Sequence, residues 1–238
     1  MLATLATTGA TATLVAGGYA YAAMWPTSQI FGRAIIGGPD VSEFALTYDD
    51  GPNDPYTQQL LDLLARYEVR ATFFLIGRFV QQRPEIVRAI RAAGHLVGNH
   101  TMSHPVLLFQ PPQRVREELA GCNAAIEDAL GEAVRYFRPP YGARRPDVLR
   151  AARDLGLTPV LWNAMGYDWK PTTAEQVLAN LQKGIRRNQQ HGCGSNLLLH
   201  DGGQAGIGQD RGHSVAATAQ LLESTRESVR YVTVDAWG

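Results

Sequence analysis

The sequence lacks the features expected of a nucleic-acid-binding protein. Lys and Arg together number 22, as do Asp and Glu, so the formal net charge is zero. There is no block of basic residues and no stretch that mixes basic and aromatic side chains. Because contact with a phosphate backbone relies on clustered positive charge, we expect no nucleic-acid partner.

Cysteine is equally scarce, since the chain contains only Cys122 and Cys193. Cysteines that bind metal normally occur in closely spaced pairs, and these two lie far apart. A cysteine-based metal centre is therefore excluded. We expect both residues to be well-buried free thiols.

Charged side chains are missing from residues 1–32, and the first is Arg33. As a helix, residues 2–25 would span about 36 Å, enough to cross a bilayer. Residues 20–22 (AYA) resemble a cleavage site, whereas the nearby aromatic residues suit a membrane interface. Three interpretations stay open for residues 1–32: an export signal, a membrane anchor, or an extension packed on the domain. The first two predict an extracytoplasmic protein, secreted or anchored.

Residues 33–238 are long enough for one domain and contain no internal repeat, low-complexity tract or linker. The pattern predicts seven apolar strands at 44–48, 71–76, 95–99, 134–137, 158–163, 196–199 and 231–234. Helices are predicted between them at 57–68, 84–93, 112–130, 146–155, 173–188 and 214–229. Uniformly apolar strands are typical of parallel strands buried on both faces. We therefore expect an α/β fold, either a β/α barrel or a doubly wound open sheet.

The uncommon polar residues follow the predicted strands, at the carboxyl end each time. They are Asp49, Asp50, His100, His104, Arg138, Asp168, Trp169, His200 and Asp201. In β/α architectures the loops at this end converge on one mouth, which carries the chemistry. We therefore expect these side chains to lie together.

Asp50, His100 and His104 form a candidate metal site. Two adjacent carboxylates repel each other unless a cation lies nearby. Histidines four residues apart would share one face if residues 100–104 formed a helical turn. Two imidazoles and one carboxylate suit zinc and leave a position open for water and substrate. The pattern therefore predicts a hydrolytic metal site.

The second aspartate, Asp49, is then free to act as a general base, although it could instead be a second metal ligand. Arg138 lies in a proline-rich turn (RPPYG), and we expect its guanidinium to orient the base carboxylate. His200 ends an apolar strand and is the candidate general acid. A base and an acid flanking a Lewis-acidic ion predict a hydrolase of carbonyl compounds.

Five segments together resemble the motifs of the polysaccharide deacetylases, carbohydrate esterase family 4. They are TYDDGP (47–52), HTMSH (100–104), RPPYG (138–142), the pair Asp168-Trp169, and LLLHD (197–201). They occur in the family's order and spacing, and the resemblance covers roughly residues 41–235. It implies a distorted (β/α)7 barrel, with residues 33–238 as the catalytic domain. Tyr48 and Met102 depart from residues frequent in the family, at positions that do not carry the chemistry.

The resemblance also implies roles for individual residues. Asp49 would be the base, His200 the acid, and Asp50, His100 and His104 the metal ligands. Arg138 would hold Asp49, and Asp168 would support Arg138 and His200. The Tyr141 N–H would stabilise the oxyanion, while Trp169 and Leu198 would form the wall of the acetyl pocket.

The resemblance further implies a single divalent metal ion, zinc first, with cobalt, nickel or manganese as alternatives. The expected reaction is removal of N-acetyl groups from chitin oligomers or peptidoglycan. O-deacetylation of acetylxylan, a non-catalytic carbohydrate-binding protein and hydrolysis of a small cyclic amide are the alternatives. Short loops predict an open groove for an acetylated amino-sugar polymer, and we expect a monomer.

Overall fold

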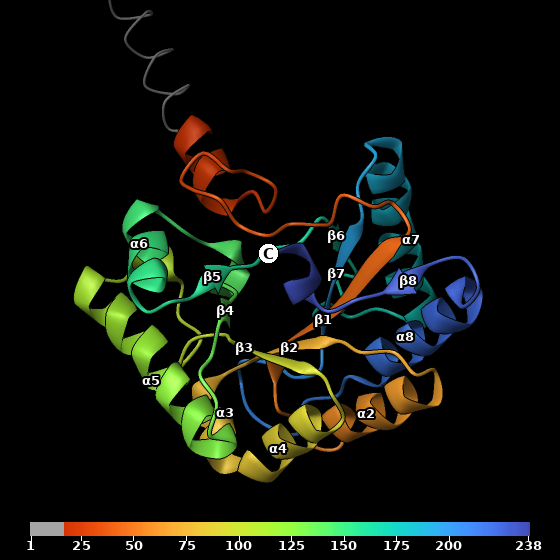
Figure 1. The fold of residues 1–238 in the computed structure, drawn as a ribbon, viewed down its shortest axis with the longest axis horizontal. Helices are drawn as coiled ribbons and strands as arrows, with labels where there is room; N and C mark the ends of the chain where they lie inside the picture. The colour runs from red at the N-terminus through yellow and green to blue at the C-terminus, as the bar shows by residue number, and fades with distance from the viewer. Residues whose placement is uncertain (1–16) are drawn as a thin grey trace, which may run out of the picture.

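The computed structural model describes residues 17–238. The signal or anchor interpretation therefore lies partly outside the described residues, because it depends on residues 1–16. Among the helices of the described part, none is both long enough and apolar enough to cross a membrane. Residues 17–24 are helical, and this short helix sits at the edge of the molecule beyond α6 (Pro146–Asp154) (Figure 1).

A single parallel sheet forms the centre of the molecule. Its strands are β1 (Glu43–Gly51), β2 (Thr72–Leu75), β3 (Leu96–Asn99), β4 (Tyr136–Phe137), β5 (Thr158–Pro159), β6 (Ala164–Met165), β7 (Ser195–His200) and β8 (Arg230–Tyr231). The order across the sheet is β5-β4-β3-β2-β1-β7-β6, and β8 pairs with the first residues of β1. β1 is therefore central, between β2 and β7.

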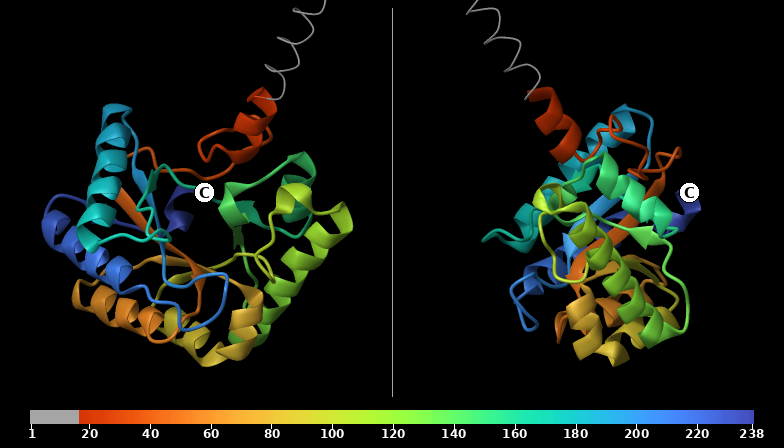
Figure 2. Two further views of the ribbon diagram at one scale, coloured as in Figure 1. Left: turned by 180° about the vertical axis from the view of Figure 1, so that it is seen from behind. Right: turned by 90° about the vertical axis from the view of Figure 1, so that its left-hand side faces the viewer.

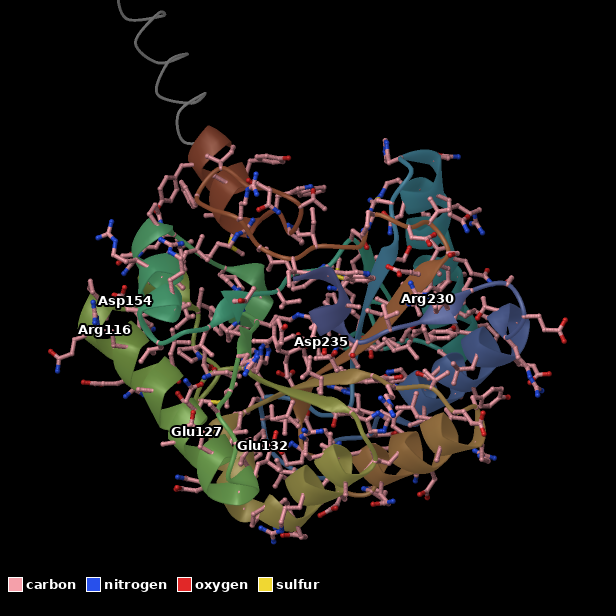
Figure 3. All side chains as sticks on the ribbon, in the orientation of Figure 1. Arg116, Glu127, Glu132, Asp154, Arg230 and Asp235 are labelled. Carbon is pink, nitrogen blue, oxygen red and sulfur yellow. The ribbon has the colours of Figure 1, made fainter. Side chains whose placement is uncertain are left out.

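Helices surround the sheet on its outside. They are α2 (Tyr56–Arg66), α3 (Gly77–Gln82), α4 (Pro84–Ala92), α5 (Pro112–Leu130), α6, α7 (Ala174–Gln190) and α8 (Gly212–Thr225), with short 3-10 turns at Leu107–Phe109, Pro140–Gly142 and Val234–Trp237. They form an outer layer around the curved sheet (Figures 1 and 2). Charged side chains lie on the outside of this layer. One example is the ion pair between Arg116 on α5 and Asp154 on α6, which are 3.3 Å apart (Figure 3). The expected (β/α)7 barrel is confirmed, as a half-barrel rather than a closed ring.

The alternating side chains of β1 divide the interior into two parts. Phe44, Leu46 and Tyr48 belong to the main apolar core, which the surrounding helices complete. Thr47 and Asp49 point into the barrel, where both contact the Arg138 guanidinium. Because successive strand residues face opposite sides, the core lies outside the sheet and the polar residues lie inside the barrel.

One predicted strand, 158–163, is wrong as a single element. β5 pairs with β4, Val160 bridges Ile35, and β6 pairs with β7 on the other side of the barrel. The chain changes partners here because this extended segment spans the open side of the half-barrel. The predicted last strand, 231–234, is also shorter, since Val234 begins a 3-10 turn. Of the eight strands, β8 pairs only with the start of β1, so the seven strands paired in sequence across the sheet end with β6.

The described part of the N-terminal segment packs on the domain. Ala22 and Ala23 are buried, and the buried Arg144 donates to the carbonyl oxygens of Trp25 (2.8 Å) and Ser28 (2.6 Å). Whether residues 1–32 act as a signal, an anchor or an extension stays a prediction. Both cysteines are free, but Cys193 is only partly buried, so the expectation of two well-buried thiols holds for Cys122 alone.

Candidate active site

A β-bulge places two adjacent aspartates on the same side of β1. The pairing with β2 shifts between Asp49 and Gly51, and Asp50 has a positive φ of 73°. Regular alternation would point Asp49 and Asp50 to opposite faces, whereas a bulge inserts one residue and re-aims its side chain. As a result, both carboxylates lie within 3.7 Å of His100 Nε2.

His100 and His104 converge through an irregular loop. The helical turn considered for residues 100–104 does not form, since these residues are irregular and both Thr101 and His104 have positive φ. Hydrogen bonds from Thr101 N–H to Asn99 Oδ1 (2.7 Å) and from Ser103 N–H to the buried Glu118 Oε2 (2.7 Å) fix the loop. The two rings lie 4.9 Å apart between centroids.

Three potential ligand atoms meet at this point. Asp50 Oδ1 lies 3.4 Å from His100 Nε2 and 3.1 Å from His104 Nε2, and one potential ligand atom from each residue lies within 4.8 Å of those of the other two. His100 Nδ1 contacts the Arg138 carbonyl oxygen and His104 Nδ1 contacts Gln204 Oε1, both at 2.8 Å. Those oxygens only accept hydrogen bonds, so each Nδ1 carries the hydrogen and, in the neutral ring, each Nε2 presents a lone pair.

This arrangement fits a divalent cation. Asp50 Oδ1 is buried and has no hydrogen-bond partner among the described residues. Three electron-pair donors face one another, an arrangement that a cation stabilises. The residues therefore suit zinc or a similar ion.

Asp49 lies beside this site and is held by Arg138. Arg138 Nη1 donates to Asp49 Oδ1 at 2.8 Å and to Thr47 Oγ1 at 2.8 Å. The other oxygen, Asp49 Oδ2, lies 3.7 Å from His100 Nε2. Arg138 thus fixes Asp49 Oδ1, while Asp49 Oδ2 faces the residues of the candidate metal site.

Arg138 is fully buried inside the barrel beneath the site, rather than exposed at its mouth. Nη2 donates to the Leu161 carbonyl at 3.1 Å, and the guanidinium lies 4.2 Å from the Phe74 ring centroid. Burial lowers the pKa of Arg138 while the Asp49 charge acts to raise it. Only Nη1 contacts Asp49, so Arg138 orients this carboxylate through a single hydrogen bond rather than a bidentate pair.

His200 lies next to Asp49 because the two residues are register partners across β1 and β7. Its Nδ1 donates to Asp168 Oδ1 at 2.8 Å, and its backbone N–H donates to Asp168 Oδ2 at 2.7 Å. Burial acts to lower the pKa of His200, but the Asp168 carboxylate outweighs it and raises the pKa to about 9. Nε2 of a protonated His200 ring can therefore donate a proton at neutral pH.

Asp168 holds His200, and none of its hydrogen bonds in the described part of the chain reaches Arg138. Its other partners are Ser214 Oγ, which donates to Oδ2 at 2.7 Å, and His213 Nε2, which contacts the backbone oxygen at 2.6 Å. Burial acts to raise the pKa of Asp168, but the contacts with His200 and Ser214 outweigh burial and hold that pKa below its ordinary value. Asp168 therefore remains an ionised partner for His200.

Exposed aromatic rings border the mouth on two sides. Trp169 is 43% exposed, with its ring 5.3 Å from that of His200, and Tyr167 lies 5.4 Å from Trp169. Tyr141 is 46% exposed and lies 4.8 Å from the His104 ring. Leu198 is buried two residues before His200 on the same face of β7, next to Leu161 and Trp162. These rings offer flat apolar surfaces beside the candidate metal site.

Backbone strain is concentrated at the same end of the sheet. Six non-glycine residues in the described part have positive φ: Asp50, Glu68, Thr101, His104, Tyr141 and Tyr167. All except Glu68 lie at the mouth. Such conformations cost about 1–3 kcal/mol each and persist where the surroundings enforce them, often at functional sites.

Several supporting residues were not identified from the sequence. They are Thr47, Asn99, Glu118, Asn196, Gln204, His213 and Ser214, each of which hydrogen-bonds to a site residue or to the loop that carries one. Thr47 and Asn196 stand in otherwise apolar strands, which is a usable signal. Asn99 is the last residue of β3, and the others lie in helices or loops, where a polar residue is ordinary.

The comparisons with known proteins agree with this geometry. The family model described as "Polysaccharide deacetylase" matches residues 37–160. A chitooligosaccharide deacetylase of Sinorhizobium fredii is 39% identical over 171 residues, covering 71% of this chain and 75% of the relative. A peptidoglycan-N-acetylglucosamine deacetylase of Bacillus cereus is 35% identical over 193 residues, covering 80% of this chain and 85% of the relative.

Solved structures show the same relationship. The Bc1960 peptidoglycan N-acetylglucosamine deacetylase, in complex with a substituted N-oxidanyl-benzamide, superposes with a TM-score of 0.77 at 30% identity, covering 85% of this chain and 91% of the other. A CE4 family pseudoenzyme from Bacillus anthracis superposes with a TM-score of 0.75 at 25% identity, covering 86% of this chain and 68% of the other. The fold therefore occurs in both active and inactive proteins.

Proposed function

The chain belongs to the polysaccharide deacetylase family, and from this premise we propose that it is a metal-dependent hydrolase of N-acetylglucosamine-containing polymers. It removes N-acetyl groups from chitin oligomers or peptidoglycan. The observation that carries the proposal is the meeting of Asp50, His100 and His104, with Asp49 and His200 beside them. An inactive relative shows that fold alone does not imply activity, so the complete set of side chains is the decisive feature.

Asp49 and His200 divide the proton transfers. A divalent ion held by Asp50, His100 and His104 would supply Lewis-acid polarisation of the amide carbonyl and acidify a water molecule. Asp49, fixed by Arg138, accepts the proton of the water that attacks the carbonyl carbon. His200 donates its proton to the leaving nitrogen as the carbon–nitrogen bond breaks, which yields acetate and a free amine.

The remaining site residues position the acetyl group. The Tyr141 backbone N–H donates a hydrogen bond to the oxygen that gains negative charge. Its left-handed conformation, with φ at 60°, supports this role because it fixes the direction of the peptide unit. Trp169 and Leu198 enclose the methyl group, from the exposed and the buried side of His200 respectively.

Exposed aromatic rings support a sugar polymer as substrate. Tyr167 and Trp169 form a neighbouring pair beside His200, and Tyr141 lies on the other side of the site. Aromatic faces provide large apolar contact area at low conformational cost, which suits the flat faces of pyranose rings. The rings are partly open to solvent, so a chain longer than one sugar has access.

Acetate release across several substrates tests this function. Purified protein is treated with a chelator, reloaded with Zn²⁺ or Co²⁺, and incubated with N-acetylchitooligosaccharides, peptidoglycan or acetylxylan. We expect acetate from the first two substrates, none after chelation, and recovery on reloading. Acetate from acetylxylan alone would instead identify an O-acetyl esterase.

A site variant separates a wrong substrate from an inactive protein. His100→Ala removes one ligand at the centre of the metal site, so it should lower zinc affinity and turnover together. If the wild-type protein binds zinc at these residues but releases acetate from no substrate, the catalytic proposal fails. The chain would then resemble the inactive member of the family.

We also propose that the catalytic domain works outside the cytoplasm, as a monomer. Support for the location comes from the absence of charge in residues 1–32 and from Tyr19, Tyr21 and Trp25 within this segment, which are exposed. Fractionation of cells that express the full chain tests the location. Recovery of the protein in the cytoplasmic fraction would contradict it, and light scattering measures the mass in solution.

A further inference from the structure

Gln204 is a side chain at the mouth that neither the sequence motifs nor the proposed mechanism uses. It lies after β7, exposed at the rim of the site. Its Oε1 accepts a hydrogen bond from His104 Nδ1 at 2.8 Å and a second one from the Tyr141 hydroxyl. One amide oxygen thus joins a candidate metal ligand to the residue with the proposed oxyanion donor.

The two candidate histidine ligands differ in how their outer nitrogen is held. His100 Nδ1 meets the Arg138 backbone carbonyl in a buried position, and a backbone oxygen cannot be changed by substitution. His104 Nδ1 depends on the Gln204 side chain instead. No other described residue hydrogen-bonds to His104 Nδ1, although its ring packs against those of His100 and Tyr141. The hydrogen on His104 Nδ1 therefore depends on one replaceable side chain.

The segment around Gln204 is fixed relative to the metal-site strand. Asp201 N–H donates to the Asp49 carbonyl at 3.2 Å, and a Cβ added at Gly202 would lie 2.2 Å from the Asp50 carbonyl oxygen. On the other side, the Arg78 guanidinium donates to the Gln204 carbonyl oxygen. Held at both points, the segment presents the Gln204 amide to His104 without large motion.

We propose that Gln204 is a positioning residue for the metal centre. By accepting from His104 Nδ1, Gln204 keeps the hydrogen on that nitrogen. The lone pair then stays on Nε2, the ring atom that lies 3.1 Å from Asp50 Oδ1, where it is available to a metal ion. Partners of this kind fix the ring and raise ligand basicity, and their loss costs about 10-fold to 100-fold in metal affinity. The inference rests on the proposed metal site.

Gln204→Leu removes the acceptor while keeping a side chain of similar length, and Gln204→Ala removes it with less bulk. Gln204→Glu keeps an acceptor oxygen. Gln189→Leu is the matched control, since Gln189 lies exposed on α7, away from the mouth. Zinc affinity is measured for each full-length protein by competition with a chromophoric chelator. The ¹⁵N shifts of the zinc-loaded proteins report which nitrogen of His104 carries the hydrogen.

We expect Gln204→Leu and Gln204→Ala to bind zinc about 10-fold to 100-fold more weakly. Gln204→Glu and Gln189→Leu should remain within about threefold of wild type, clearly below the 10-fold lower bound of that range. Equal zinc affinity in the wild type and in both acceptor-free variants would overturn the inference while leaving the proposed function intact. Failure of the wild-type protein to bind zinc would instead overturn the proposed function. Because two variants remove the acceptor, one that fails to fold does not decide the result.

Discussion

β1 carries acidic side chains at both of its ends, and the two ends have opposite surroundings. At the first residue, Glu43 is buried and both of its oxygens are occupied: Arg230 contacts one, and Trp237 Nε1 donates to the other at 2.7 Å. At the far end, Asp50 Oδ1 is buried without a hydrogen-bond partner in the described part of the chain. A satisfied carboxylate stabilises the fold, whereas an unsatisfied one marks a place for a ligand.

The two ends of the sheet differ in the same way beyond β1. Near its beginning lies a cavity of about 280 Å³, lined by Arg33, Ala34, Ile35, Ile36, Gly37, Thr158 and Trp237. That lining contains no carboxylate and no imidazole, so it offers no acid–base pair. At the mouth, buried acids and histidines are close together. The contrast places chemistry at the carboxyl ends of the strands and structural contacts at the other end.

The largest expected effect on activity comes from a substitution at the far end of β1, where the site lies. Asp49→Asn should lower kcat by about 100-fold to 10,000-fold, because it removes the proposed base but leaves all three metal ligands. Zinc affinity is measured in parallel by chelator competition. Loss of zinc together with activity would show that Asp49 is a metal ligand instead of the base.

His200→Ala should have the next largest effect. It removes the proposed acid and should reduce kcat by about 100-fold or more, with little change in zinc affinity. The ratio of kcat to KM should fall as well, since the proton is needed in the transition state. Turnover equal to that of the wild type would eliminate the assignment of His200 as general acid.

Asp168→Asn should move the pH profile. In the wild type, Asp168 raises the pKa of His200 to about 9, and activity is lost as pH rises through that value because the acid loses its proton. Without the carboxylate, burial still lowers the pKa of His200 and only the more distant charges of Asp50 and Asp49 raise it, so the pKa falls below about 9. The alkaline limb of kcat/KM should therefore shift to lower pH, measured with the same metal in both proteins. An unshifted limb would show that another group titrates there.

The same ion pair affects stability in a defined pH window. Asp168 has a lowered pKa, so its contribution to the free energy of unfolding is lost as pH falls below its ordinary value of 3.8. His200 has a raised pKa, so the contribution is full below pH 6.5 and is lost as pH rises through about 9. The difference in Tm between wild type and Asp168→Asn should therefore shrink at both extremes.

Glu43→Gln should have the smallest effect on activity and a measurable effect on stability. It weakens a buried acceptor of Arg230 and Trp237, which should cost about 1–2 kcal/mol of unfolding free energy. Denaturant titration measures this loss, and acetate release should stay within about twofold of wild type, since the change lies far from the mouth. A large loss of activity in this variant would undermine the separation between the two ends of β1.

The sequence by itself determined the alternation of strands and helices and the end of the sheet that carries the site. Apolar strands alternating with amphipathic helices leave few alternatives to a parallel β/α fold. Because polar residues followed one strand after another, their convergence at one mouth could be predicted without coordinates. The motifs around Asp49, His100, Arg138 and His200 gave the resemblance from residue identity and spacing alone.

Only the tertiary structure decided which atoms face one another. The bulge that turns Asp50 to the same side as Asp49 depends on the register with β2, and register is a long-range property. The loop at 100–104 is held by Asn99 and by Glu118 on α5 rather than by helical periodicity, so spacing alone gave the wrong local structure. Gln204 reaches His104 from a hundred residues away. Hydrogen-bond partners distant in the chain leave no periodic signal in sequence, because nothing in the spacing records which loops meet.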